Sequence, residues 1–204
     1  METIAYYLAL VCVMAVPAAL ASWFVLHLLA PWLRRAGPIA VRAATVAVIL
    51  AVMGAVFLIR QPVLRQHFGV QVPLVGVAVI FFGVSSYLRT RILRQIPMRM
   101  MLDLPKMAGQ DAGKLITGGI YSRMRHPGYV AMAFAVAAAA LFTNYLAMYV
   151  VALAYMPLIG LVAVLDEREL ATRFPGEYRA YCARVPRFIP RFSASGRHGG
   201  KDAP

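Results

Sequence analysis

The 204-residue sequence has few acidic residues and little charge of any kind. It contains 8 Asp and Glu residues against 21 Lys and Arg, and charged residues make up 14% of the chain, whereas 61% of it is hydrophobic. Soluble domains usually carry about 25% charged residues. Together with a mean hydropathy of +0.69, this composition excludes an ordinary soluble protein and predicts an all-α, polytopic membrane protein.

Cysteine is equally scarce, with two residues in the chain. Cys12 lies in an apolar run and Cys182 in a polar tail, so a disulfide between them is not expected. Two cysteines also provide no framework for a metal site. We therefore expect neither a disulfide nor a bound metal.

The net charge of +13 raises the question of nucleic-acid binding. The basic residues, however, lie between and after apolar runs and not along one soluble face. Membrane orientation and attraction to anionic lipid headgroups explain that distribution better. We expect the lipid bilayer to be the partner of this charge, and no nucleic acid.

Long apolar runs dominate the chain and predict about five transmembrane helices. The runs cover residues 4–30, 39–59, 72–88, 130–142 and 146–165. The fourth run would form only about 20 Å of helix, whereas the hydrocarbon core is about 30 Å thick. Its helix is therefore expected to extend back through Tyr129 or to begin inside the membrane.

The charges between the apolar runs predict an orientation. With five spans and the N-terminus outside, the basic residues at 34–35, the connection 89–125 and the whole tail lie on the cytoplasmic side. Only Arg60 and Arg65 are then left outside, as the positive-inside rule requires.

Polar residues gather in TGGIYSRMRHPGY, residues 117–129, just before an apolar helix. Gly118 and Gly119 allow backbone angles closed to other residues and a close approach of a ligand. Pro127 is suited to the first turn of the next helix, whose free N–H groups could bind a carboxylate or phosphate. The alternative is an interfacial anchor, with Tyr121, Tyr129 and the arginines at headgroup depth.

Asp166 and Glu167 end the last apolar run, on the side where the orientation places Arg125 and His126. Paired carboxylates at a membrane boundary are costly unless they meet cations. One interpretation is a salt-bridged helix end that includes Arg168. The other is a pocket with a carboxylate wall, an arginine–histidine wall and an apolar opening to lipid, which suits a cationic, aromatic and carboxylated cofactor.

The tail predicts an amphipathic C-terminal helix that could lie on the membrane or cap the site. Apolar side chains recur there at helical spacing, at Leu170, Phe174, Tyr178 and Tyr181. VPRFIPRF, residues 185–192, is expected to be extended and packed at the interface. Residues 193–204 are expected to be disordered.

A series of motifs runs through residues 113–192: GIYSRMRHPGY, the apolar hairpin, DEREL, FPGEY, Tyr181 and VPRFIP. In this order the motifs resemble the family of isoprenylcysteine carboxyl methyltransferases and phospholipid methyltransferases, integral membrane enzymes that use S-adenosyl-L-methionine. The resemblance implies a methyltransferase core at 89–192 with a cytoplasmic cofactor pocket. The three runs within 1–88 contain almost no reactive side chains, so they are interpreted as a three-helix transmembrane scaffold.

The resemblance also implies which residues bind the methyl donor. They are Gly113, Lys114, Leu115, Ile116, Tyr121, His126, Pro127, Tyr129, Asp166 and Glu167. The chemistry of these residues agrees, because carboxylates can receive the ammonium or ribose hydroxyls of the donor and a helix start can receive its carboxylate. Phe174, Tyr178 and Tyr181 are expected in a closing C-terminal helix.

Three departures from the family pattern bear on the substrate. Asp166 stands where the family often has Glu, which shortens the reach to the donor by one methylene, and Pro175 stands where the FG motif has glycine. Isoprenylcysteine enzymes have a substrate-binding arginine four residues before the acidic pair, where this chain has Val162. That difference argues against a prenylated-cysteine carboxylate as the methyl acceptor.

The expected function is S-adenosylmethionine-dependent methyl transfer to a lipophilic small molecule or lipid that enters from the bilayer. The reaction is either O-methylation, as in the isoprenylcysteine enzymes, or N-methylation of a phospholipid. The expected catalytic residues are Arg125, which would orient an anionic group, and His126 and Glu167, which could assist deprotonation, as could Tyr129.

A rival from another class is a non-catalytic membrane protein or small transporter. That rival predicts polar groups facing one another within several spans, and the first three runs offer almost none. No oligomeric state follows from the sequence.

Overall fold

The computed structural model describes residues 1–29, 32, 35–95 and 115–190, and these residues form helices and no strand. The helices are α1 (Glu2–Leu28), α3 (Pro38–Leu58), α4 (Arg60–Val63), α5 (Val72–Leu93), η1 (Gly119–Ser122), α7 (Pro127–Thr143), α8 (Leu146–Arg173) and α9 (Glu177–Arg184). Helices α1, α3, α5 and α8 are long and apolar enough to cross a membrane, and α7 is a shorter apolar helix. The prediction of an all-α polytopic membrane protein is confirmed.

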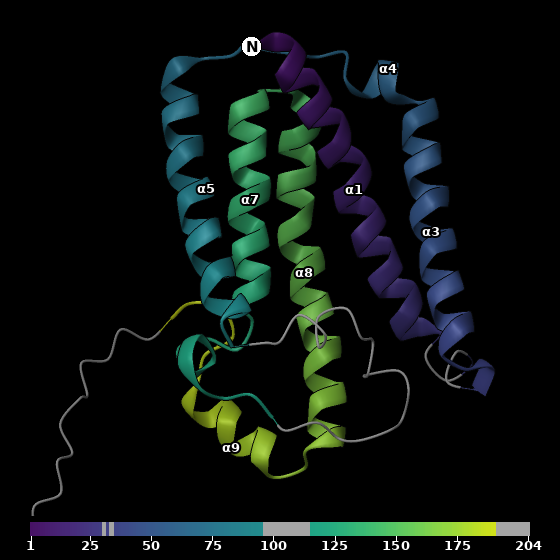
Figure 1. The fold of residues 1–204 in the computed structure, drawn as a ribbon, viewed down its shortest axis with the longest axis vertical. Coiled ribbons are helices and arrows are strands. Elements are labelled where there is room, and N and C mark those ends of the chain that lie inside the picture. The colour runs from purple at the N-terminus through teal and green to yellow at the C-terminus, as the bar shows by residue number, and fades with distance from the viewer. Residues whose placement is uncertain (30–31, 33–34, 96–114, 191–204) are drawn as a thin grey trace, which may run out of the picture.

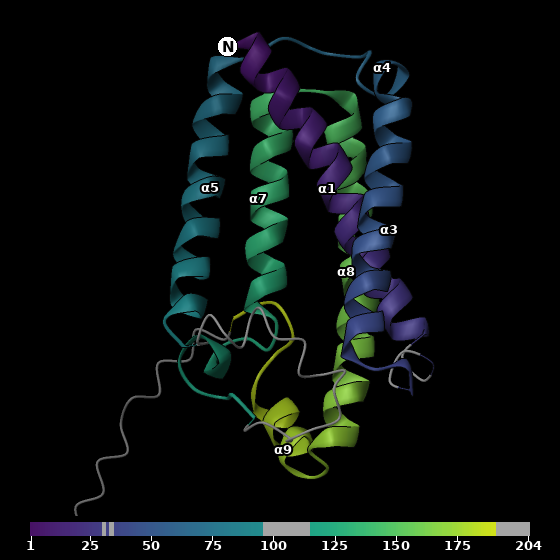
Figure 2. The ribbon, with the colours of Figure 1, turned by 45° about the vertical axis from the view of Figure 1, so that its right-hand side comes forward.

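Helices α1, α3, α5, α7 and α8 run side by side, with α7 between α5 and α8 (Figure 1). Helix α7 packs against α5 and α8, α1 packs against α7 and α8, and α3 packs mainly against α1. Helices η1 and α9 lie together beyond one end of the bundle, and the N-terminus and α4 lie at the other end (Figures 1 and 2).

Small residues let α7 pack closely against its neighbouring helices. Ala131, Ala138 and Ala140 are buried on it, and small side chains allow membrane helices to approach closely. The hydroxyl of Ser85 on α5 donates a hydrogen bond to the carbonyl of Ala131 at 2.8 Å. Within lipid such a bond satisfies a hydroxyl that has no water to bind.

Two helix boundaries differ from the sequence prediction, and one agrees with it. Helix α7 begins at Pro127, so the prediction that it extends back through Tyr129 is confirmed. Helix α5 continues to Leu93, five residues past the expected end, and therefore includes Arg89 and Arg91. Helix α8 continues to Arg173, which places the acidic pair within a helix and not at its end.

The prediction of one amphipathic helix from Leu170 to Tyr181 is wrong. Helix α8 ends at Arg173 and α9 begins at Glu177. Pro175 provides no backbone donor and disfavours helical angles at the preceding residue, and Gly176 turns the chain with φ +90°. Phe174 therefore lies at the break and not in a closing helix. The tail predicted to be disordered, 193–204, lies outside the described residues.

The end of the bundle near the N-terminus is closed by the turn between α7 and α8. Asn144 is buried in this turn with φ +53°. Its amide donates a hydrogen bond to the carbonyl of Gly69 at 2.7 Å, and its side-chain oxygen accepts one from the Tyr149 hydroxyl at 2.8 Å. The His67 ring stacks on Tyr145, with centroids 4.4 Å apart. These contacts attach the loop before α5 to the hairpin.

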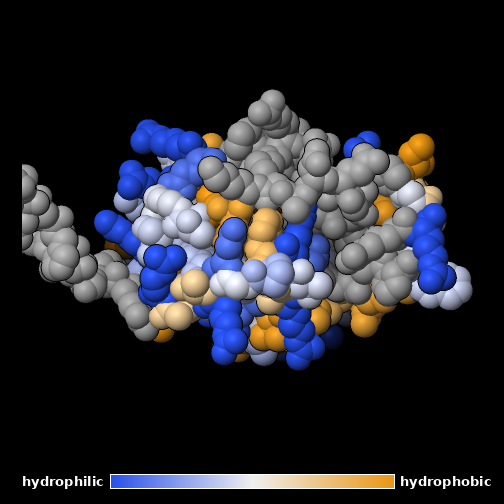
Figure 3. Space-filling model, turned by 90° about the horizontal axis from the view of Figure 1, so that it is seen from below, coloured by the Kyte–Doolittle hydropathy of each residue, from blue (hydrophilic) through white to orange (hydrophobic). Residues whose placement is uncertain are grey.

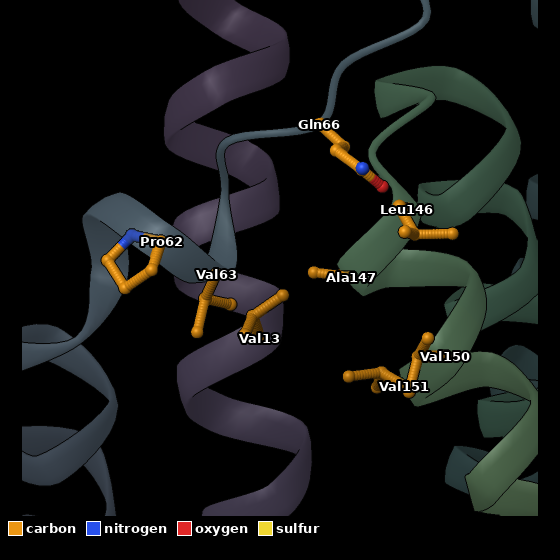
Figure 4. A pocket seen from close by; sticks show the side chains of 8 residues that line it. All are labelled: Val13, Pro62, Val63, Gln66, Leu146, Ala147, Val150 and Val151. Atoms are coloured by element: carbon orange, nitrogen blue, oxygen red, sulfur yellow. The ribbon is translucent and has the colours of Figure 1, made fainter.

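An apolar groove of about 340 Å³ lies at the same end (Figure 4). It is lined by Val13, Pro62, Val63, Gln66, Leu146, Ala147, Val150 and Val151. Since none of these side chains ionises, the groove offers no acid–base chemistry.

We predict that Asn144→Ala lowers the free energy of unfolding by about 2 kcal/mol, because it leaves the Gly69 carbonyl and the Tyr149 hydroxyl without their partner. Thermal unfolding in detergent micelles, followed by circular dichroism, measures this loss. Asn144→Gly is the matched variant, because it removes the same side chain while glycine tolerates the positive φ. Its loss of stability therefore reports the hydrogen bonds without backbone strain. A stability of Asn144→Ala equal to that of the wild type would contradict the role of this turn.

Candidate active site

The Glu167 carboxylate lies at the centre of a charged cluster at the α9 end of the bundle. Its Oε1 lies 3.0 Å from Nε2 of His126 and 3.1 Å from Nη1 of Arg125. Arg187 donates from Nε to Oε1 at 2.9 Å and from Nη2 to Oε2 at 2.7 Å. The Glu167 side chain is 11% exposed. Because burial removes most of its water, these donors supply the solvation that the carboxylate needs.

Asp166, the neighbouring carboxylate, is bound by α7. Its Oδ2 accepts a hydrogen bond from the Tyr129 hydroxyl. The Tyr129 ring is stacked on the His126 imidazole, with centroids 5.3 Å apart and planes inclined by 10°. Successive residues of a helix point about 100° apart, so the two acids reach different partners that themselves touch.

The C-terminal strap, residues 185–190, returns from α9 to the start of α7 (Figure 2). The backbone N–H of Arg125 donates to the carbonyl of Pro186 at 2.9 Å, and that of His126 donates to the carbonyl of Arg187 at 3.1 Å. The Phe188 ring lies 5.8 Å from the His126 ring. The strap therefore holds the residues that precede α7 through main-chain bonds as well as through Arg187.

The Arg125 guanidinium links the strap side of the site to α9. Besides Glu167, its Nη1 lies 2.8 Å from Sγ of Cys182. Its Nε is buried and has no acceptor among the described residues. An arginine has five N–H donors, so this side chain retains capacity for an anion.

A second wall of the site is apolar and aromatic. Tyr178 and Tyr181 of α9 are buried with Leu115 packed against them. The Tyr181 hydroxyl donates a hydrogen bond to the carbonyl of Tyr121 at 2.6 Å. Burial raises the pKa of Tyr181 to about 12, so this hydroxyl stays protonated and keeps its role as a donor.

The glycine turn before η1 serves packing in this structure. Gly119 has φ +57°, and a Cβ built there would lie 1.5 Å from the amide nitrogen of Gln95. Gly118 has φ −88°, which any residue adopts, so the expectation of an unusual backbone is wrong at Gly118 and correct at Gly119. The group that approaches Gly119 is the side chain of Gln95, two residues after the end of α5.

The protonation state of His126 follows from its surroundings. Burial lowers the pKa of His126, although Glu167 and Asp166 act in the opposite direction. A neutral imidazole carries one N–H, and a carboxylate only accepts. Nε2 must therefore carry the proton that is shared with Glu167, which leaves a lone pair on Nδ1.

The structure brings most of the sequence-predicted site residues together. Arg125, His126 and Glu167 are in direct contact, and Tyr129 joins His126 to Asp166. Pro127 is buried and starts α7, so the predicted helix start is confirmed. Leu115 lies on the aromatic wall, and Ile116 precedes η1. The Tyr121 side chain packs instead against the cluster of Leu88 and Ile92, and its carbonyl accepts the hydrogen bond from Tyr181. Gly113 and Lys114 lie outside the described residues.

Arg187 and its strap are missing from the predicted site. The expectation of separate carboxylate and cation walls also differs from the structure, since Glu167 binds the cations directly. A signal for Arg187 was present, because an arginine within the apolar, proline-bounded stretch VPRFIP needs a partner if that stretch is packed. The sequence does not indicate that this partner is Glu167, because the two residues lie 20 positions apart.

Fold and site thus define a polytopic membrane protein with a charged cluster at one end, and this end presents many hydrophilic side chains on its surface (Figure 3). The profile of the phospholipid methyltransferase family matches residues 73–174, half of the chain. The chain therefore belongs to this family of membrane methyltransferases.

One curated relative is the cobalt-zinc-cadmium resistance protein CzcN of Cupriavidus metallidurans. It is 36% identical over 88 residues, which cover 43% of this chain and 40% of CzcN. The chain thus spans less than half the length of the relative that it matches. No solved structure matches the chain.

We predict that the folded protein loses stability as the pH falls below about 6.5, the ordinary pKa of histidine. Because the pKa of His126 is lowered in the folded state, the unfolded chain takes up this proton first, and acid favours unfolding. Thermal unfolding on both sides of this pH should show a smaller acid loss in His126→Gln than in the wild type.

His67→Gln is the control, since His67 lies in the loop at the other end of the bundle. It should leave the contribution of His126 in place. An identical acid loss in the wild type and His126→Gln would show that His126 does not titrate in this range.

Proposed function

We propose that this protein is an S-adenosyl-L-methionine-dependent methyltransferase whose acceptor is a lipophilic small molecule or lipid. The observation that carries the proposal is that the acidic pair of α8 contacts the start of α7. Glu167 contacts Arg125 and His126 of the RHP turn, residues 125–127, and Asp166 binds Tyr129. The chain belongs to the phospholipid methyltransferase family. Both halves of this contact come from the stretch that the family profile matches.

The chemical groups of the site fit this cofactor. Glu167 and Asp166 can receive an ammonium group or ribose hydroxyls. The first turn of α7 offers N–H groups to a carboxylate, since Val130 is the first residue whose N–H bonds back to His126. The buried Nε of Arg125 is a further donor without an acceptor among the described residues. Leu115, Ile116 and Tyr121 would complete the binding segment.

The bound cofactor would supply an activated methyl group, which leaves alignment and exclusion of water to the protein. Arg125 would orient an anionic group of the acceptor, which carboxylic acids and phospholipid headgroups both possess. His126 is neutral, and its Nδ1 could take a proton from an amine or hydroxyl acceptor, while Glu167 keeps the ring oriented through Nε2. A carboxylate acceptor needs no such base.

The bundle interior beside this cluster supports a lipophilic acceptor. Tyr129 and the α1 residues Leu20, Trp23 and Phe24 all pack against a cluster that includes the buried Tyr155, and the rings of Trp23 and Tyr129 lie 6.2 Å apart. Tyr129 therefore belongs both to the polar contacts of the site and to the apolar interior next to them. O-methylation of a carboxyl or hydroxyl group is the leading version, and N-methylation of a phospholipid amine is the alternative.

Two other functions receive less support. A transporter would place polar groups inside several spans, whereas the charged cluster described here lies at one end of the bundle. Metal handling, which the name of CzcN raises, would need ligands. Within the described ranges, no three His, Cys, Asp or Glu side chains are grouped to hold a metal ion.

We further propose that this end faces the cytoplasm and that the N-terminus lies outside. The distribution of basic residues between the two ends of the bundle, within the described part of the chain, supports this orientation. Arg60 and Arg65 lie at the α4 end, while the α9 end carries the C-terminal arginines of α5 and the basic residues of 123–125 and 168–187.

We predict that Glu167→Gln weakens S-adenosylmethionine binding by tenfold or more, on the order of one charge-assisted hydrogen bond. Isothermal titration calorimetry of the detergent-purified protein measures the affinity. Glu177→Gln is the matched control, because Glu177 is an exposed acid at the start of α9. Wild-type affinity in a folded Glu167→Gln variant would remove Glu167 from the pocket, and a wild type that binds no cofactor would overturn the proposed function.

The orientation has its own test. In a background without Cys12 and Cys182, single cysteines at Arg65 and Arg179 should label oppositely with a membrane-impermeant thiol reagent in intact cells. Arg65→Cys should react from outside, and Arg179→Cys, on the exposed side of α9, should react only after lysis. The reverse pattern would place the site outside the cytoplasm.

A further inference from the structure

Oε1 of Glu167 has no acceptor capacity left for a ligand, and Arg187 is the residue that binds Oε2. Four nitrogen atoms, from Arg125, His126 and Arg187, lie 2.7–3.1 Å from the two oxygens of Glu167. A carboxylate has about four lone-pair sites. Three of these nitrogens lie on Oε1, so an ammonium or hydroxyl group can bind Oε1 only if one of them leaves, and at Oε2 it meets the Arg187 guanidinium.

Arg187 is the donor best able to leave. Its side chain is 39% exposed, whereas those of Arg125 and His126 are 13% and 8% exposed. Arg125 and His126 directly precede α7, and their backbone N–H groups are bound by the strap. Arg187 uses its own carbonyl for that contact, so its side chain can move while its backbone stays in place.

If Arg187 is displaced from Glu167, its guanidinium stays nearby and lacks a carboxylate partner. An α-amino acid group carries its ammonium and its carboxylate on the same carbon. If the ammonium replaces Arg187 on Glu167, the adjoining carboxylate comes within reach of the displaced guanidinium. Guanidinium binds carboxylate in bidentate geometry, as Arg187 already does with Glu167.

We propose that Glu167 and Arg187 form an exchangeable ion pair that receives the α-amino acid end of the methyl donor. One internal ion pair is replaced by two intermolecular pairs, Glu167 with the ammonium and Arg187 with the carboxylate. This inference rests on the proposed function and adds Arg187, from outside the stretch matched by the family profile, as a cofactor-binding residue.

The test compares the affinities of S-adenosylmethionine and decarboxylated S-adenosylmethionine, which keeps the ammonium but lacks the carboxylate. Calorimetry is performed on the full chain in lipid nanodiscs. The wild type should prefer S-adenosylmethionine, and Arg187→Gln should reduce this preference about 10- to 100-fold. The decarboxylated compound should bind Arg187→Gln at least as well as the wild type, because Glu167 is no longer occupied by Arg187.

Arg184→Gln is the matched control, because Arg184 is an exposed arginine of α9 whose Nε contacts the Ala180 carbonyl. It should keep the wild-type preference. If Arg187→Gln fails to fold, Arg187→Lys provides the measurement. Lysine keeps the charge but loses the bidentate geometry, so the preference should fall by less.

An unchanged preference in Arg187→Gln or Arg187→Lys would overturn the inference while leaving the proposed function intact. An equal change in affinity for both compounds would also overturn it, since Arg187 would then act without regard to the carboxylate. A wild type that binds neither compound would overturn the proposed function and the inference together.

Discussion

The structure depends on one buried carboxylate. Glu167 follows Asp166 at the end of the apolar part of α8, and its side chain is 11% exposed. A carboxylate in such a place is strongly destabilising unless cations and N–H donors surround it. The donors come from the turn before α7 and from the strap after α9, so one charge brings together segments about 20 and 41 residues away along the chain.

This requirement organises the elements around the site. To deliver Arg187, the chain must reverse after α8, which the break at Pro175 and Gly176 permits. The reversal folds α9 under the bundle and buries Tyr178 and Tyr181. Tyr181 then binds the carbonyl of Tyr121, which fixes the segment leading to the RHP turn. The polar contacts and the aromatic wall are therefore parts of one arrangement.

The sequence predicts the membrane helices well because hydrophobicity acts locally. Residues 72–88 and 146–165 are recognisable as spans from their own composition. The errors lie where polar residues continue a helix, as at Arg89 and Glu167, since hydropathy marks the end of an apolar stretch and not the end of hydrogen bonding. The spacing of Leu170 and Tyr178 predicts one helix, yet the turn at Gly176 places them on two different helices, α8 and α9.

The site was predictable in part for the same reason. The RHP turn and the acidic pair each concentrate charge next to an apolar helix, which is visible in the sequence. The two acids point in different directions because they are successive residues of α8. Asp166 therefore binds Tyr129, and Glu167 binds the cations. The role of Arg187 depends on a long-range return of the chain, for which no local pattern exists.

The order of synthesis gives the strap a further consequence. Helices α1, α3, α5, α7 and α8 all precede it in the chain, so the bundle can insert and pack before Arg187 has left the ribosome. Until then Glu167 has only Arg125 and His126 as partners, and the RHP turn lacks the two carbonyls that bind it. In that order of synthesis, the charged cluster is completed last, after the helices that carry its other members.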